Sequence, residues 1–309
     1  MKLPPVNSIS ADQNSDKQIQ RLAAATAIYS RAKLILALQV VLTVVGGAVS
    51  AIVVAKVSGL KVWVASYSFG VALLDALVLE PEQSELRKMG AKVQEIFDCE
   101  LLCLPWRKLV TGDHPDRELV VDEAAKYNSK HPDLSGLRDW YPVAVSRVSL
   151  PIGRLICQRS NPWWDFTLRG RYRLGLKVIL WSLGAFVFAI AIYTRLTIGT
   201  FVLAVLAPLT PAILWGTREL RKQTTAIEAL GKLKEHIGDT WNAALEGTLK
   251  DELLDQASIE IQNEIYRSRA QNPLIFNWVN GLLRNRQQKS MNDAAEEMVA
   301  EALSKRAQA

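Results

Sequence analysis

The chain has 309 residues, of which 49% are hydrophobic and 22% charged, with a formal net charge of +6. So much apolar material excludes an intrinsically disordered protein, and three cysteines are too few, and odd in number, for a secreted disulfide scaffold. Because its mean hydropathy of +0.07 is high for a soluble chain of this size, we expect a membrane protein with sizeable water-facing parts.

Residues 1–33 are predicted to form an N-terminal amphipathic helix outside the membrane. They lack the apolar core and the small-residue cleavage site of a signal peptide. Ile19, Leu22, Thr26 and Tyr29 fall on one face of a helix, which is the pattern of a surface helix with one apolar side.

Residues 34–79 are predicted to form a transmembrane helical hairpin. Crossing hydrocarbon takes about 20 mostly apolar residues as a helix, and residues 34–57 contain 14 Leu, Ile or Val. Residues 60–79 are a weaker span because they contain Asp75, which costs about 2.5–3.5 kcal/mol at the bilayer centre and less near its edge. Only two residues separate the segments, so we expect them to insert together.

Two polar side chains in this hairpin are candidate intramembrane or pore residues. Gln39 lies five residues into the first span, and Asp75 lies four residues before the end of the second. At about 1.5 Å per residue, both lie roughly 6–7.5 Å from the same membrane face. One interpretation is a polar site that faces the bundle interior or lines a pore between copies. The alternative is a hydrated Asp75 near the headgroups that has no role.

Residues 80–173 are predicted to be a helical cytoplasmic region. Residues 83–104 place apolar side chains at helical spacing until Pro105 ends that helix, and residues 119–127 form a shorter one. No stretch alternates polar and apolar residues long enough to predict a sheet. The whole chain is therefore expected to be all-α.

A cluster of aromatic, basic and amide side chains precedes the third span. Tryptophan and arginine are expected anchors at a membrane interface, but the amides and the acid among them better suit a specific hydrogen-bonded joint. We predict that this joint connects the cytoplasmic region mechanically to the third helix, where the movement that opens a gate would have to act. Its candidate residues are Trp140, Tyr141, Arg159, Asn161, Trp164, Asp165, Arg169 and Tyr172.

Residues 174–215 repeat the hairpin pattern. Apolar segments at 174–193 and 196–215 are joined by two residues, and the second segment has no charged residue. Its Pro208 and Pro211 remove backbone donors and should kink it. The sequence thus predicts four spans in two hairpins. Pairing by two-residue loops argues against the alternative, which is four buried helices of a soluble core.

Residues 216–309 are predicted to be a cytoplasmic C-terminal helical region. Apolar residues recur at three- and four-residue steps through residues 220–245, a stripe suited to packing on the central region or on another copy. Residues 274–283 form a shorter helix, and the charged residues 292–309 are expected to fray.

The basic residues predict the orientation. Residues 1–33, 80–173 and 216–309 hold 5, 15 and 13 Lys or Arg, which is 33 of 37. Because basic loops stay in the cytoplasm, both termini and the central region are predicted to be cytoplasmic. The charge suits an anionic ligand and anionic lipid headgroups equally well.

No catalytic constellation is recognisable in the sequence. It has no Walker-type phosphate loop, no G-x-S-x-G, no H-E-x-x-H and no G-x-G-x-x-G. Cys99 and Cys103 stand four residues apart on one predicted helix, but a structural zinc needs four ligands. We interpret them as two buried thiols, and we expect no enzyme, no metal site and no bound cofactor.

Several short motifs surround the two hairpins in a fixed order. They are Tyr29–Lys33, Gln94–Asp98, Leu104–Trp106, Asp139–Pro142, the cluster from Cys157 to Tyr172, Asn272-Pro273, Trp278 and Arg284. In this order and placement they resemble the SMODS-associated four-transmembrane effectors, a family of bacterial anti-phage proteins to which pore formation is attributed. The resemblance covers nearly the whole chain.

The resemblance implies an effector of cyclic-oligonucleotide signalling (CBASS) in the bacterial inner membrane. A partner nucleotidyltransferase makes a cyclic nucleotide on infection, and the effector, as a homo-oligomer, breaches the membrane so that infection is abortive. It implies a cyclic oligonucleotide as the activating ligand and no nucleic acid polymer as a partner. From the residues alone, a constitutive small-solute or ion channel or transporter and a membrane-anchored scaffold stay open as alternatives.

Overall fold

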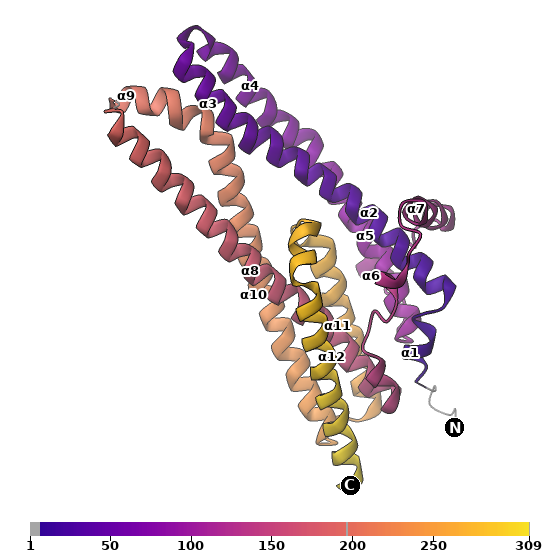
Figure 1. Cartoon of the computed structure of the whole chain (residues 1–309). Helices are drawn as coiled ribbons and strands as arrows, with labels where there is room; N and C mark the ends of the chain where they lie inside the picture. Colours follow the sequence, from indigo (N-terminus) through magenta and orange to yellow (C-terminus); the bar gives the residue numbers. More distant parts are fainter. Residues whose placement is uncertain (1–6, 196, 309) are drawn as a thin grey trace.

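The computed structural model describes residues 7–195 and 197–308, and those residues form helices and connecting turns without a strand (Figure 1). The prediction of an all-α protein is therefore confirmed for the described part. Residues 1–6 of the predicted N-terminal region, Leu196 at the start of the predicted fourth span and Ala309 lie outside it.

The first predicted hairpin is the upper part of two long helices. After α1 (Ile9–Asp12), the chain forms one continuous helical rod and then a second rod that runs back in the opposite direction. The first rod is α2 (Asp16–Val40), the π-helical η1 (Val41–Val45) and α3 (Gly46–Lys56). After η2 (Ser58–Leu60), the second rod is α4 (Lys61–Leu74), the π-helical η3 (Asp75–Leu79) and α5 (Glu80–Leu101). The amphipathic helix and the first span are thus one continuous element.

The second hairpin is built differently on its two sides. One side is a single 44-residue helix, α8 (Leu150–Tyr193). The other side consists of α9 (Ile198–Phe201), the π-helical η6 (Val202–Leu206) and α10 (Ala207–Leu245). Figure 1 shows a bend where η6 meets α10, the position of Pro208 and Pro211, as the missing donors of these residues predict.

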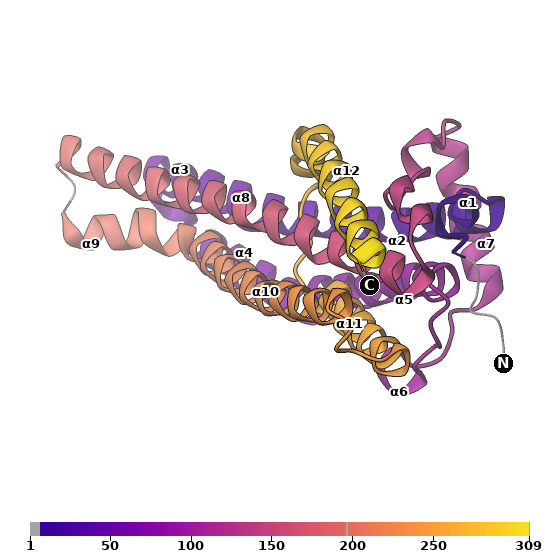
Figure 2. The ribbon, with the colours of Figure 1, turned by 90° about the horizontal axis from the view of Figure 1, so that it is seen from below.

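Three described helices are long and apolar enough to cross a membrane, namely Asp16–Val54, Val62–Leu101 and Leu150–Tyr193. Their apolar side chains point outward: Trp63 and Phe69 on α4, and Trp181 on α8, are all more than 70% exposed. The predicted fourth span is divided among α9, η6 and the start of α10. Both hairpin turns lie at one end of the molecule, and α1 and the end of α12 lie at the other (Figures 1 and 2).

Two glycines set the spacing where helices of the hairpins approach. A Cβ on Gly47 of α3 would lie 3.1 Å from the carbonyl oxygen of Pro208 in α10. A Cβ on Gly216 would lie 2.8 Å from a methyl carbon of Leu180 in α8. The missing side chains therefore let α10 pack on both α3 and α8. Among the described residues, α8 makes no substantial contact with α3 or α4.

The remaining helices form a bundle at the end opposite the hairpin turns. They are α6 (Lys108–Thr111), α7 (Arg117–Lys130), η4 (Ser135–Leu137), η5 (Val143–Arg147), α11 (Asp251–Gln271) and α12 (Asn277–Gln308). The buried alanines Ala23 and Ala24 let α2 pack closely against α5 and α7. Phe97, Leu155 and Ile237 are fully buried in the main core, whose burial supplies roughly 1.5–3 kcal/mol per large side chain.

Two sequence expectations in this region are wrong. The segment 292–309 does not fray in its described part, because it continues α12 and buries Ala295 and Val299 in the main core. Cys99 is buried but Cys103 is exposed. The reason is that α5 ends at Leu101, and Cys103 has a left-handed backbone (φ 53°), so it no longer shares the buried face of that helix.

Candidate functional site

Gln39 and Asp75 are in direct contact where the hairpin helices meet the lower bundle. The Gln39 side-chain nitrogen donates to Asp75 Oδ1 at 2.8 Å, and Gln83 of α5 donates to Gln39 Oε1 at 2.8 Å. A guanidinium nitrogen of Arg218, from α10, lies 3.5 Å from Asp75 Oδ2. We call these four residues the inner polar cluster. It joins both hairpins, and it satisfies an acid that would otherwise be isolated.

The inner polar cluster coincides with irregular helix geometry. Asp75 is the first residue of the π-helical η3, and Gln39 precedes η1 by two residues. The hydroxyl of Thr43, inside η1, donates to the Gln39 carbonyl at 2.6 Å. π-Helical turns are rare and occur frequently at functional sites, so the local backbone marks the same position as the polar side chains.

A small cavity of about 20 Å³ adjoins the inner polar cluster. Further charged residues line it, namely Glu80, Arg87, Glu219 and Lys222. Lys222 Nζ of α10 lies 2.6 Å from Glu80 Oε1 of α5, a second link between the hairpins. The cavity is therefore polar in character although it lies at the base of apolar helices.

A short connector forms part of the wall of this cavity, on the side of the lower bundle. Residues 272–276, which join α11 to α12 and which we call the elbow, place Pro273 and Leu274 on the cavity wall. Leu274 packs with Leu36 of α2, and Ile275 packs with Tyr172 of α8. Figure 1 shows this end of the α11–α12 pair between the two long rods. The elbow thus contacts helices of both hairpins where they enter the lower bundle.

Two buried arginines hold the backbone at the elbow. Arg169 of α8 donates to the Pro273 carbonyl at 2.7 Å and to Gln223 Oε1 at 2.8 Å, and its Nε donates to Asp165 at 2.8 Å. Arg87 of α5 donates to the Ala270 carbonyl at 2.9 Å. Carbonyls at the end of a helix have no intrahelical partner, so these charge-assisted bonds fix the position of the elbow.

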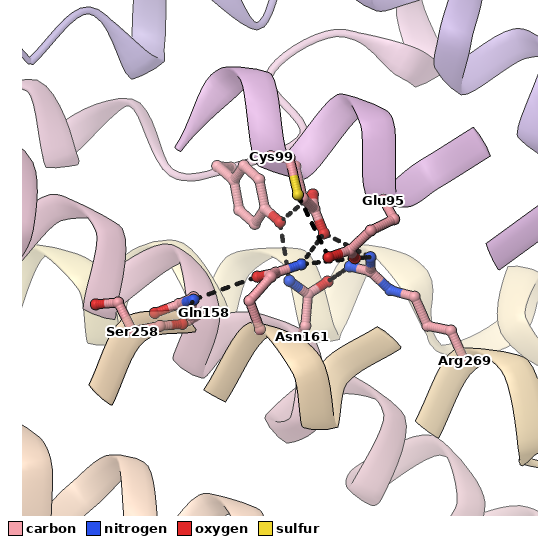
Figure 3. Close-up of polar contacts among 9 residues, drawn as sticks. Glu95, Cys99, Gln158, Asn161, Ser258 and Arg269 are labelled. Carbon is pink, nitrogen blue, oxygen red and sulfur yellow. Dashed lines mark hydrogen bonds and ion pairs between the residues drawn. The ribbon is translucent and has the colours of Figure 1, made fainter. Parts of the chain in front are cut away.

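A second buried group, which we call the core cluster, lies deeper in the lower bundle (Figure 3). It joins α5, α8, α11 and the segment before η5, and it consists of Glu95, Asp98, Tyr141, Asn161, Gln262 and Arg269. Arg269 forms an ion pair with Asp98 and donates to Asn161 Oδ1 at 2.9 Å. The Tyr141 hydroxyl donates to Asp98 Oδ1 at 2.7 Å.

The core cluster holds two carboxylates and one guanidinium. Gln262 Nε2 donates to Glu95 Oε2 at 2.9 Å, while the Arg269 guanidinium is 3.8 Å from that oxygen. Burial, reinforced by the charge of Asp98 and opposed by Arg269, raises the pKa of Glu95 to about 7. The Arg269 guanidinium therefore pairs mainly with Asp98, and the Glu95 carboxyl gains or loses its charge near neutral pH.

The structure divides the eight residues of the predicted joint. Tyr141 and Asn161 belong to the core cluster, and Asn161 Nδ2 also donates to the Tyr141 hydroxyl at 2.9 Å. Asp165, Arg169 and Tyr172 lie at the elbow instead, where Asn272 donates to Asp165 at 3.4 Å.

The other three residues of the predicted joint lie apart from these two groups. Trp140 packs half-buried against the main core, and the Trp164 carbonyl accepts from Gln287 at 3.3 Å. Arg159 lines a separate pocket between α8 and α12. The joint is thus two networks, and Trp140, Trp164 and Arg159 belong to neither.

Sequence reasoning missed most partners of these networks. Arg269 and Asp98 are 171 positions apart, and Arg87 meets Ala270 across 183. The sequence contained one signal for Glu95 and Asp98. Both lie among the apolar residues of the predicted helix 83–104, so part of the acidic side chains of this helix must share its buried side. Within the described residues, no group of three or more His, Cys, Asp or Glu side chains could hold a metal ion.

Comparison with known proteins places the chain in a family context. The SMODS-associating 4TM effector domain matches residues 7–298. A protein of Bacillus cereus (strain VD146) named "Probable CBASS effector molecule" is 24% identical over 289 residues, which cover 90% of this chain and 94% of the relative. No solved structure matches.

Proposed function

This chain belongs to the SMODS-associating 4TM effector family, and we propose that it is a non-enzymatic CBASS effector that opens the bacterial inner membrane when a cyclic oligonucleotide binds its cytoplasmic part. A partner nucleotidyltransferase makes the nucleotide. Assembled copies of the effector breach the membrane, and the infection becomes abortive. Both termini and the region between the hairpins face the cytoplasm.

The observation that carries this proposal is the inner polar cluster next to the elbow. A buried acid at the membrane edge of a helix bundle is costly and needs a reason to be there. Here Asp75 is only 7% exposed and is bonded to Gln39, with Arg218 beside it. In the described conformation Pro273 and Leu274 of the elbow form part of the wall of the adjoining cavity. This is the arrangement expected of a closed state that hides the polar lining of a path.

Displacement of the elbow would open that path. α8 and α10 each run without interruption from the lower bundle into the second hairpin. Arg169 on α8 and Gln223 on α10 meet at the elbow, 2.8 Å apart. A ligand that moves the lower ends of these helices would therefore change the contacts of Arg169 with the elbow, and water could reach Asp75.

The test is dye release from liposomes that contain the purified full-length protein. We expect no release without nucleotide and rapid release with one member of a panel of cyclic di- and trinucleotides. Arg284→Gln serves as a variant that alters a contact outside the elbow, since Arg284 donates to the Gly136 carbonyl at 2.6 Å. It should respond to the same nucleotide as the wild type.

Three results would contradict the proposal. Steady release without any nucleotide would instead indicate a constitutive channel or transporter. No release with any nucleotide, together with no growth arrest when the chain is expressed beside a cyclic-oligonucleotide synthase, would favour a membrane-anchored scaffold. Nucleotide turnover by the purified protein would make it an enzyme.

A further inference from the structure

One face of the first turns of α12 is apolar and uncovered. Trp278 and Leu282 stand four residues apart, so they lie on one side of the helix. Their side chains are 65% and 76% exposed, and a Cβ added to the neighbouring Gly281 would meet no described atom within 4 Å. The buried side of the same turns packs on α8 through Val279 and Leu283. A tryptophan and a leucine left uncovered side by side mark an interaction surface.

The start of α12 lies at the level where the hairpins enter the membrane. Asn277 Oδ1 accepts from Lys33 Nζ at 2.6 Å, and Lys33 directly precedes the first predicted span. Leu176 of α8 packs against the small core that contains Val279, and it is the third residue of the third predicted span. Contacts with both hairpins thus place Trp278 at the boundary between hydrocarbon and headgroups.

Charges are divided along α12. Residues 272–292 contain three Lys or Arg and no acid, whereas residues 293–304 contain four acids and no Lys or Arg. Arg286 and Lys289 are exposed and follow the apolar pair by one and two turns on the same side. From the elbow outward, this side of the helix is therefore apolar, then basic, then acidic.

This order matches the layers of a bilayer surface. The polar headgroup region adds about 5–7 Å to each side of the hydrocarbon. α12 runs from the elbow toward the end opposite the hairpin turns (Figure 1), so at about 1.5 Å per residue Leu282 lies at most about 6 Å beyond Trp278. Arg286 lies at most about 12 Å beyond it, and its long side chain can reach back to the phosphates. Tryptophan is enriched at this depth, and basic residues near it are attracted to anionic lipids.

A second copy of the chain fits this face less well. A stable interface between proteins buries about 1,000 Å² or more, and the apolar part of this face consists of two side chains. A symmetric contact through the apolar pair would also bring the basic residues Arg286 and Lys289 of both copies close together. The exposed apolar surface of the hairpins, by contrast, already requires a bilayer at the same level.

We propose that the first three turns of α12 bind the anionic surface of the membrane. Trp278 and Leu282 lie among the headgroups, and Arg286 and Lys289 pair with lipid phosphates. The ring centroid of Phe276 in the elbow is 6.5 Å from that of Trp278, so the bilayer holds the elbow from outside the bundle. The inference goes beyond the proposed function, because it requires the hairpins to lie in a bilayer but involves no nucleotide.

Spin-label accessibility tests this anchor in the full-length protein without nucleotide. A Cys103→Ser background keeps only the two buried cysteines. A nitroxide is attached at Leu282→Cys or at Gly281→Cys, and its collisions with oxygen and with a water-soluble nickel chelate are measured in nanodiscs that contain phosphatidylglycerol. We expect the oxygen-to-nickel collision ratio at both positions to be at least about threefold higher than at Leu303→Cys, an exposed position near the other end of α12.

The basic residues are tested with the same readout. Arg286→Gln combined with Lys289→Gln should lower the ratio at Leu282→Cys in phosphatidylglycerol to its value in phosphatidylcholine, because the attraction to anionic lipid is lost. Lys305→Gln removes an exposed charge near the far end of α12 and should leave the ratio unchanged. If the ratio at Leu282→Cys is the same in both lipids before these charges are removed, the assignment of the cations is wrong.

A label at Phe69→Cys, a strongly exposed position of α4, separates this inference from the proposed function. If the label at Phe69→Cys collides mainly with oxygen while those at Leu282→Cys and Gly281→Cys collide mainly with nickel, the anchor is wrong and the effector proposal stands. Nickel collisions at all three positions would place the hairpins outside the bilayer and contradict both. Dipolar broadening at Leu282→Cys that disappears when unlabelled protein is mixed in before reconstitution would show that a second copy covers the face, which also overturns the anchor.

Discussion

Asp75 shows how an acidic side chain is accommodated at the edge of an apolar hairpin. The carboxylate accepts from Gln39, and Arg218 lies near its other oxygen. The first partner was predictable, because matching depths in an antiparallel hairpin place positions 39 and 75 side by side. The second was not, since Arg218 reaches Asp75 across 143 residues, and no local periodicity records such a distance.

Asp75→Asn tests whether the carboxylate faces the conducting path. The amide keeps an acceptor for Gln39 but removes the charge. We expect ligand-activated proteoliposomes to show a cation-over-anion permeability ratio lowered by about fivefold, the effect of removing about 1 kcal/mol of attraction for a passing cation. Reversal potentials in asymmetric salt measure it. The control is Glu82→Gln, which neutralises an exposed acid on the first turn of α5. An unchanged ratio for Asp75→Asn would show that this residue has only a structural role.

Glu95 should make stability depend on pH near neutrality. Its pKa is raised to about 7 by burial and by Asp98, with Arg269, Gln262 and Cys99 as its other neighbours. Because the unfolded pKa is lower, the stability that Glu95 contributes is present at low pH and is lost as the pH rises through about 7.

Glu95→Gln should remove this dependence. When the pH is raised from 5.5 to 8, we expect the unfolding temperature of the wild type to decrease by several degrees relative to that of the variant, because the pKa of Glu95 is raised. Thermal unfolding in detergent at several pH values measures it. Glu297→Gln, an exposed acid on α12, should track the wild type. Parallel curves for Glu95→Gln and the wild type would place the titration elsewhere.

At the level of helices, the elbow shows what sequence patterns cannot supply. Asn272-Pro273 marks a helix boundary in the sequence because proline cannot continue a helix. The two hairpins were predictable because span length and apolar content are local properties. That the elbow lies beneath both hairpins depends on Arg87 and Arg169, whose targets are backbone carbonyls with no sequence signature. The burial of 295–302 was missed for a similar reason, since charged neighbours hide its short apolar face.

Arg169→Lys should loosen the elbow. Arg169 uses Nε for Asp165 and Nη1 for both Gln223 and Pro273, and a lysine cannot reproduce that fork. We expect a loss of about 2 kcal/mol in unfolding free energy and measurable dye release without nucleotide. The matched control is Arg171→Lys, at an exposed position of the same helix. If the variant is destabilised but its liposomes release no dye without nucleotide, the elbow does not close the path.

The whole molecule is a two-ended body with the turns of the two predicted hairpins at one end (Figure 1). The surface of the hairpin end is apolar, and the charged bundle lies at the other end. Its composition already predicted two such regions. The way in which η6 and α10 pack on the first hairpin was not predictable, because it depends on glycine contacts between residues far apart in sequence.

Cys103 reports the orientation of this body without any engineered label. It is exposed on the lower bundle, whereas Cys99 and Cys157 are buried. A membrane-impermeant maleimide should leave Cys103 unmodified in intact spheroplasts and modify it in inside-out vesicles, as the excess of basic residues on that side predicts. Cys103→Ser should abolish the signal in vesicles. Modification in intact spheroplasts would reverse the topology.

The bare upper half of α8 has a consequence for how many molecules act together. A closed wall around a water-filled conduit requires each helix to have a neighbour on both flanks. None of the most apolar stretch of α8 is buried, and in the described part of the chain α8 makes no substantial contact with α3 or α4. One molecule therefore cannot complete such a wall, and additional subunits would have to supply the second flank. The rate of release should then increase with a power of the protein-to-lipid ratio greater than one, and the value of that exponent would give the stoichiometry of the conducting unit.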